Sequence, residues 1–198
     1  NAVINMTVED YLKEPEWKKK DYYRGYRVGV EYPFRPTEVE PYFLGLWLGD
    51  GSNSDVRITT MEKEVVKYLE EYSNRLGLSV SKYPERSKAD SYAITNITGK
   101  EKIKNPIRTF LSQNLYGNKH IPENYLNNSR EVRLKLLAGL IDSDGYKSNA
   151  KGKENTLEIS FSVKRLADDT VILLRSLGYR ASVVKKIVVL NGKEFETY

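Results

Sequence analysis

The order of apolar and polar residues along this chain predicts both helices and strands. Apolar residues recur at helical spacing in residues 62–76 and 166–177, and each segment is followed by a glycine, Gly77 or Gly178, where a C-terminal cap favours one. Apolar and polar residues alternate, as in strands, in several other segments. These strand candidates are residues 56–60, 79–83, 92–98, 157–163, 181–189 and 195–198.

Two apolar segments are similar to each other: FLGLWLGDG at 43–51 and LAGLIDSDG at 137–145. Both have the length of a helix, and both carry a glycine, Gly45 or Gly139, at the third position. Because glycine has no side chain, another backbone can lie close against it. We therefore expect these two helices to pack together and to bring their Asp-Gly ends side by side.

The order helix, strand, strand, helix, strand, strand occurs in outline twice. It favours a duplicated α+β architecture over a βαβ sheet. We expect an N-terminal annex and linker at 1–41, a first half at 42–128 and a second half at 129–198. A helix over 106–115 and a helical run that begins at Ser129 join the halves.

The annex has a pattern of its own. Thr7 is a candidate cap for a helix over residues 8–20, and residues 26–32 alternate as a strand would. Prolines then interrupt the pattern, which is typical of a linker. These prolines are Pro33, Pro36 and Pro41.

Composition limits the chemistry. The chain has 198 residues, 39% of them hydrophobic and 30% charged, with no cysteine and one histidine, His120. This excludes disulfides, thiolate zinc sites, cysteine nucleophiles and multi-histidine metal sites, and leaves oxygen ligands and lysine. No apolar run reaches the length of a membrane span and nothing resembles a secretory signal, so we expect an intracellular protein without membrane contact.

The net charge of +5 favours a polyanionic partner without identifying one. Some of the basic residues have a plain explanation. In the helical run that leads into the second apolar segment, basic and apolar residues alternate at amphipathic spacing, so we expect these charges on a solvated face. They are Arg130, Arg133 and Lys135.

The two terminal carboxylates are the candidate metal ligands. Asp50 and Asp144 each end an apolar helix, where a negative charge opposes the helix dipole at a cost of up to about 1 kcal/mol. The repetition of this unfavourable choice indicates a bound cation, because two adjacent carboxylates suit a divalent metal ion. The alternative is that each Asp-Gly pair is only a turn signal.

The strand candidates carry one apolar set of positions and one polar, partly basic set. A β-ribbon fits the DNA major groove, where Arg, Lys, Ser and Thr reach base edges and phosphates. The polar set is therefore predicted to bind DNA, and the alternative is a solvated sheet face without a ligand. Its members are Arg57, Thr59, Lys82, Thr95, Ser160, Ser162, Arg180 and Lys185.

The segment at 137–145 resembles the signature of the LAGLIDADG homing endonucleases and departs from it only at Ser143, while 44–51 resembles the looser first copy of two-motif members. The run NKHIP at 118–122 and the approach at 29–33 are similar to intein-encoded members. The resemblance covers the chain from residue 24 onward. It implies a pseudo-two-fold αββαββα fold, with paired LAGLIDADG helices at the interface and two curved antiparallel sheets that enter the major groove.

The resemblance also implies roles for single residues. Asp50 and Asp144 would bind Mg²⁺, with Mn²⁺ as an alternative ion, and the carbonyls of Gly49 and Ser143 are further ligand candidates. Lys119 matches the basic residue that positions or activates a water near the metal, and the plain alternative is a solvated surface lysine. Hydrolysis at one such centre per strand would give a double-strand break in DNA.

These observations together predict a monomeric, site-specific double-strand DNA endonuclease, encoded within an intein and linked in cis to a splicing domain. No lysine of the second half can be assigned as a second catalytic base. Two alternatives remain open: a catalytically weak or inactive DNA- or RNA-binding remnant or maturase of the same fold, and a basic α+β interaction domain with no nucleic-acid role.

Overall fold

In the computed structural model, the described residues (3–25, 27–84, 89–97, 104–148, 156–190 and 192–198) form helices and small antiparallel sheets. The expected α+β class is confirmed at this level. No helix of the described residues is long and apolar enough to cross a membrane. The helices are α1 (Val8–Lys13), α2 (Glu16–Asp21), α3 (Pro41–Asp50), α4 (Lys63–Arg75), α5 (Pro106–Asn114), α6 (Glu123–Leu126), α7 (Arg130–Asp144) and α8 (Lys164–Ser176). The strands are β1 (Arg57–Thr60), β2 (Ser79–Tyr83), β3 (Asp90–Thr95), β4 (Gly145–Lys147), β5 (Leu157–Ile159), β6 (Lys186–Leu190) and β7 (Lys193–Thr197).

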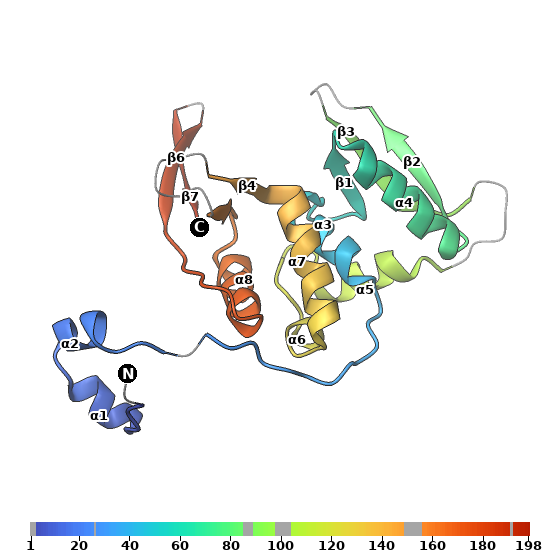
Figure 1. Cartoon of the computed structure of the whole chain (residues 1–198). Coiled ribbons are helices and arrows are strands. Elements are labelled where there is room, and N and C mark those ends of the chain that lie inside the picture. The colour runs from blue at the N-terminus through green and yellow to red at the C-terminus, as the bar shows by residue number, and fades with distance from the viewer. Residues whose placement is uncertain (1–2, 26, 85–88, 98–103, 149–155, 191) are drawn as a thin grey trace.

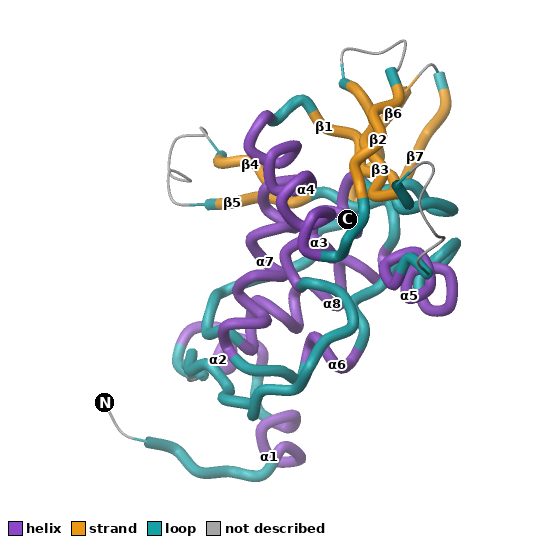
Figure 2. The backbone as a smooth tube through the Cα atoms, turned by 90° about the vertical axis from the view of Figure 1, so that its right-hand side faces the viewer, coloured by secondary structure: helices purple, strands orange, loops and turns teal. Residues whose placement is uncertain are grey.

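Two helices, α3 and α7, lie side by side at the centre of the molecule, with strands to either side of the pair (Figures 1 and 2). A Cβ atom on Gly45 would lie 2.2 Å from the carbonyl oxygen of Leu136, and one on Gly139 would lie 2.2 Å from that of Tyr42. These distances are far below van der Waals contact, so only glycine permits this approach. The close packing that the two glycines predict is present.

Local signals explain where these helices begin. Pro41 occupies the first turn of α3, where its missing N–H costs nothing. The hydroxyl of Ser129 caps α7 and accepts a hydrogen bond from the Val132 amide at 3.4 Å. Toward solvent, the Tyr42 hydroxyl donates to Asp142 Oδ2 at 2.7 Å and joins α3 to α7.

The strands that follow α3 form one sheet in the order β1-β3-β2, with α4 across one face (Figure 1). Ile58 and Ile94 share the helix-covered face and are buried in the same cluster as Val65 and Leu69 of α4. Strand β2 has the predicted bounds, whereas Thr98 of the predicted strand 92–98 lies outside the described residues. Gly77 follows α4 with φ of 66°, as the predicted cap requires.

The strands that follow α7 do not form one sheet in the described residues. β4 pairs with β5, and β6 pairs with β7 as a separate hairpin. Two main-chain hydrogen bonds of 2.9 Å between Phe161 and Tyr198 connect the pieces. The predicted strands 157–163 and 181–189 are therefore shorter than expected, because a period-two pattern cannot show where a strand lacks a partner.

The N-terminal helix prediction is wrong in one respect. The expected helix over residues 8–20 is two helices, because Pro15 removes an N–H and holds Glu14 extended, with φ of −67° and ψ of 146°. Neither α1 nor α2 buries a residue, and both stand apart from the main body (Figure 1). Thr7 caps α1 as predicted, through a hydrogen bond from the Asp10 amide at 3.1 Å.

The predicted strand at 26–32 is absent from the described residues 27–32. Residues 28–39 form an extended segment, here called the strap, that lies against the main body. The Val30 amide donates to the Ser176 carbonyl at 2.8 Å. The Tyr125 hydroxyl contacts both main-chain groups of Val39, at 3.1 and 2.7 Å. The strap is thus held by scattered main-chain hydrogen bonds rather than by a neighbouring strand.

The expectation of a solvated Arg133 is also wrong. Its side chain is fully buried and donates to the carbonyls of Asn128 (2.8 Å), Ser176 (2.9 Å) and Val30. Its guanidinium also lies 5.1 Å from the ring centroid of Tyr32. Arg133 can be buried because its guanidinium donates to carbonyls of three chain segments, and amphipathic spacing alone gave no sign of this.

Candidate active site

The two terminal carboxylates lie at the same end of the helix pair. Asp50 and Asp144 are the last residues of α3 and α7, and extended glycines follow both of them. A Cβ atom on Gly49 would lie 2.7 Å from Asp144 Oδ2 and 2.1 Å from Ser143 Oγ. The Asp144 carboxylate therefore rests directly against the backbone that precedes Asp50. Gly49 is required there because a side chain has no room.

The electrostatics of this pair favour a cation. Burial raises the pKa of Asp50 to about 6, the charge of Asp144 adds to the increase, and Lys119 opposes it. Burial also raises the pKa of Asp144, again opposed by Lys119. Two half-buried carboxylates that repel each other gain from any positive charge placed between them.

The donor set suits a hard divalent ion with a partial water shell. Among the described residues no group of three or more His, Cys, Asp or Glu side chains could hold a metal ion. An ion here would rely on the two carboxylates, on nearby main-chain oxygens of Gly49 or Ser143, and on water. Oxygen ligands with retained waters are what Mg²⁺ accepts in proteins.

Lys119 reaches this end of the helices from the loop between α5 and α6. Its Nζ donates to the carbonyls of Gly51 at 2.7 Å and Gly49 at 3.2 Å, and lies 5.0 Å from the ring centroid of Trp47. With 7% of its surface exposed, it is not a solvated surface lysine. Burial lowers its pKa to about 8, and the two nearby carboxylates, Asp144 and Asp50, oppose this.

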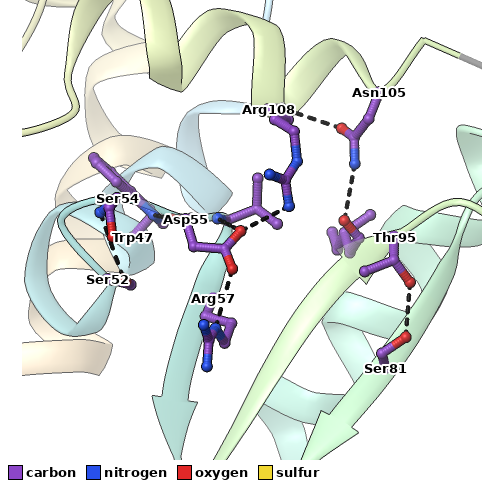
Figure 3. A network of polar contacts seen from close by, with 11 residues as sticks. Trp47, Ser52, Ser54, Asp55, Arg57, Ser81, Thr95, Asn105 and Arg108 are labelled. Atoms are coloured by element: carbon purple, nitrogen blue, oxygen red, sulfur yellow. Dashed lines mark hydrogen bonds and ion pairs between the residues drawn. The ribbon is translucent and has the colours of Figure 1, made fainter.

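A polar network connects Trp47 to the sheet (Figure 3). The Trp47 indole N–H donates to the Asp55 carbonyl at 2.9 Å. The Asp55 carboxylate accepts from Arg57 Nε at 3.1 Å and from Arg108 at 2.8 Å. Sequence reasoning missed Trp47, Asp55 and Arg108. Trp47 offered one signal, because a buried indole N–H needs an acceptor.

The structure divides the four DNA-binding candidates of the first sheet between its two faces. The strand register places Arg57, Thr59 and Thr95 on the face away from α4. Hydroxyl pairs Thr59–Ser91 (2.9 Å) and Ser81–Thr95 (2.7 Å) lie on the same face.

Lys82 is on the opposite face, where it pairs with Asp90 at 2.6 Å and lies 5.9 Å from the Tyr92 ring centroid. The prediction that Lys82 and Arg57 lie on the same sheet face is therefore wrong. The sequence did contain a signal for this. Lys82 is two residues from the apolar Val80 in β2, so both side chains point to the face that α4 covers.

The four candidates after residue 129 lie outside the strands. Ser160 and Ser162 flank Phe161 in the segment that follows β5, and both are exposed. Arg180 and Lys185 are exposed in the segment that leads to β6, and Lys185 pairs with Glu196 at 2.6 Å. The described residues do not gather these four side chains on one sheet face.

Part of the sequence matches a known family. The family model described as homing endonuclease matches residues 120–197. The chain is 32% identical over 160 residues to the replicative DNA helicase DnaB of Mycobacterium intracellulare, which covers 80% of this chain and 22% of that protein. It is 29% identical over 177 residues to the homothallic switching endonuclease of Saccharomyces cerevisiae, covering 78% of this chain and 30% of that protein.

A third relative is the ATP-dependent DNA helicase Hel308 of Thermococcus kodakarensis, 29% identical over 156 residues, which covers 73% of this chain and 13% of that protein. The chain thus spans less than a third of the length of each of these relatives. Its sequence contains no Walker A pattern of the form GxxxxGK[ST], so the nucleotide-binding motif typical of helicases is not within it.

Proposed function

This chain belongs to the homing endonuclease family, and on that premise we propose that it is a site-specific, Mg²⁺-dependent endonuclease that hydrolyses phosphodiester bonds in double-stranded DNA. The observation that carries the proposal is the meeting of two half-buried carboxylates and one buried lysine at the end of α3 and α7. The two carboxylates cost free energy to bury beside each other, and a cation between them offsets that cost.

Each residue has a defined part in this proposal. Asp50 and Asp144 would hold Mg²⁺, with Mn²⁺ as the alternative ion, and the carbonyls of Gly49 and Ser143 would complete the protein ligands. When bound by these residues, the ion would supply Lewis-acid chemistry at a phosphate oxygen and at a bound water. Lys119 offsets phosphate charge, and its pKa of about 8 lets its amino group exchange a proton near neutral pH. The hydrogen bonds that it donates to the carbonyls of Gly49 and Gly51 fix the direction of that amino group.

We also propose that the fold is the duplicated, pseudo-two-fold αββαββα fold, with regions at 1–41, 42–128 and 129–198. The equivalence of α3 with α7 and of α4 with α8 supports this, as does the glycine cap that follows each of α4 and α8, at Gly77 and Gly178. In this arrangement each set of strands would contact one side of the DNA. Arg57, Thr59 and Thr95 are then the first-half contacts.

The same proposal covers the origin of the chain. The matches to two helicases extend over only 22% and 13% of those proteins, which fits an endonuclease region carried inside a larger host protein. We propose an intein origin, with a splicing domain linked in cis, and a monomer, because one chain already holds both carboxylates. A light-scattering mass of twice 22.8 kDa would contradict the monomer.

The test uses duplex DNA that carries the host-gene site without the insertion. We expect wild-type protein to cut it in Mg²⁺ and only to bind it in Ca²⁺. Asp50→Asn and Asp144→Asn keep size and should reduce cutting at least about 100-fold while binding persists, because a bound metal supplies several kcal/mol of transition-state stabilisation.

Two other results would each replace the proposal. Site-specific binding without cutting in any metal would identify a non-cleaving remnant or maturase. Weak binding that is equal for all DNA and lost at moderate salt would leave only a basic interaction domain.

A further inference from the structure

Two arginines from different elements share one carboxylate beside the candidate active site (Figure 3). Arg57 comes from β1, Arg108 from α5, and Asp55 lies between them with both of its oxygens engaged. The two side chains are 40% and 54% exposed, while that of Asp55 is 21% exposed. The group therefore has a net charge of +1 and presents it to solvent.

Among the residues that the structure describes, most of the hydrogen-bonding capacity of this pair is unused. A guanidinium carries five N–H donors. Within the described residues, Arg57 and Arg108 each make one side-chain ion pair, to Asp55. Arg57 is also held over the ring of Tyr83 at 5.1 Å from its centroid. Both guanidiniums are thus held in place while no described residue occupies most of their donors, which is the arrangement that bidentate phosphate recognition requires.

The two arginines are connected to the candidate active site through Asp55 and Trp47. Arg57 is on the same sheet face as Thr59 and Thr95, away from α4. The main-chain carbonyl of Asp55 accepts from Trp47, whose ring lies against Lys119. One continuous set of contacts therefore runs from the lysine at the carboxylates to the two guanidiniums.

We propose that Arg57 and Arg108 together bind a backbone phosphate of the DNA, and that Asp55 is the positioning residue that holds both guanidiniums for it. This inference rests on the proposed function. It adds Arg108 to the DNA interface, and it assigns Arg57 to phosphate contact and register rather than to the reading of bases.

The test measures DNA affinity as a function of salt, for a target duplex and for an unrelated duplex. Each lost phosphate contact lowers the slope of log K against log salt by about 0.9. We expect Arg57→Ala and Arg108→Ala each to show that change and about tenfold weaker binding on both duplexes alike.

Arg75→Ala is the matched control. Arg75 is 55% exposed, is helical and pairs with one carboxylate, that of Glu40, as Arg108 pairs with Asp55. It lies at the end of α4 and should leave both slope and affinity unchanged. An equal slope change in Arg75→Ala would overturn the proposal, because the effect would then reflect net charge alone.

For Asp55→Asn, two explanations predict changes in DNA affinity of opposite direction. Removal of a negative charge near DNA should strengthen binding if Coulomb attraction alone matters. If Asp55 positions the two arginines, binding instead weakens, on both duplexes, by about the factor seen for the single arginine variants. Tighter binding by Asp55→Asn overturns the positioning role. A melting temperature for each variant shows that the compared proteins are folded.

The failure of this inference differs from the failure of the proposed function. Wild-type protein that binds and cuts its target, with arginine variants of unchanged salt slope, contradicts only the phosphate pair. Weaker binding of Arg57→Ala to the target alone would mean base contact and also contradicts it. Wild-type protein that shows no DNA binding contradicts the proposed function itself.

Discussion

The regions that follow α3 and α7 begin alike and end differently. Each has a terminal carboxylate, a helix of 13 residues and a glycine of positive φ after that helix. After α3, three strands form a single sheet that buries Ile58 and Ile94. After α7, the described strands form two separate pairs, and β6 leaves Ile187 and Val189 in solvent. Helices and their caps are specified locally, whereas a sheet exists only where partners meet.

The same asymmetry reaches the candidate active site. Asp50 and Asp144 are contributed equally by the two helices, but the one lysine that perturbs both pKa values, Lys119, comes from the region before residue 129. In the described residues after 129, no basic side chain has this effect on either carboxylate. Each helix thus supplies one carboxylate, whereas Lys119 has no counterpart in the described residues after 129.

The largest effect is expected from replacing Lys119, the base that has no counterpart in the second region. Lys119→Met should slow cleavage by about 100-fold or more, since a positioned proton-transfer group typically contributes 10²–10⁴. The measurement labels each DNA strand separately. We expect the two strands to be slowed unequally, because Lys119 approaches from one side. Lys119→Arg is the control that keeps the charge, and an equal loss on both strands would contradict the asymmetry.

The next largest effect concerns the close contact between α3 and α7, which the two regions share. Gly45→Ala should destabilise the protein by about 3 kcal/mol or more, because its Cβ would lie 2.2 Å from the Leu136 carbonyl and neither helix can move freely. Chemical denaturation measures the change. Gly25→Ala, which meets nothing within 4 Å, is the control and should stay within about 0.5 kcal/mol. Equal stability of the two variants would mean that the helices do not touch.

A matched pair of isoleucines compares the two sets of strands. Ile94 in β3 is 1% exposed and Ile187 in β6 is 60% exposed. Ile94→Ala should cost about 2–5 kcal/mol of unfolding free energy, and Ile187→Ala less than about 0.5. A large loss from Ile187→Ala would show that β6 is covered in solution and that the two regions are more alike than their strands indicate.

The smallest expected effect is a pH dependence. A carboxyl group with a raised pKa in the folded state binds protons better when folded, so its contribution to stability is lost as the pH rises from about 4 through about 6. In chelator at pH 7, Asp50→Asn should therefore be more stable than wild type, by about 1 kcal/mol because solvent screens part of the effect. Below pH 4 the difference should vanish.

Metal addition sharpens this result. Saturating Mg²⁺ should raise the melting temperature of wild type but not of Asp50→Asn, since only the wild type keeps both ligands. Asp21→Asn, on exposed α2, is the control for a general change of charge. A stability difference between wild type and Asp50→Asn that does not change between pH 4 and 7 would contradict the electrostatic account of the pair.

Much of the helical structure could be predicted from the sequence because its signals are local. Gly77 and Gly178 mark the ends of α4 and α8, and Ser129 marks the beginning of α7. Gly45 and Gly139 predicted a contact between helices that are far apart in the sequence, because the absence of a side chain has meaning only where something else fills the space.

The rest depended on partners that a pattern cannot show. Arg133 follows amphipathic spacing, yet it is buried by carbonyls that arrive from the strap and from α8. Asp55 has no motif and acquires a role only when α5 brings Arg108 beside β1. Such positions follow from long-range register and cannot be inferred from spacing alone.

The strap has a mechanical consequence. It is fixed at Val30, by Ser176 and Arg133, and again at Val39, by Tyr125, before it reaches Pro41 and α3. A load applied to α1 or α2 is therefore taken up by these anchors and not by the helix that ends at Asp50. Residues upstream of position 28 are thus separated from Asp50 by two sets of hydrogen bonds, the first of which, through Arg133, is made to α7.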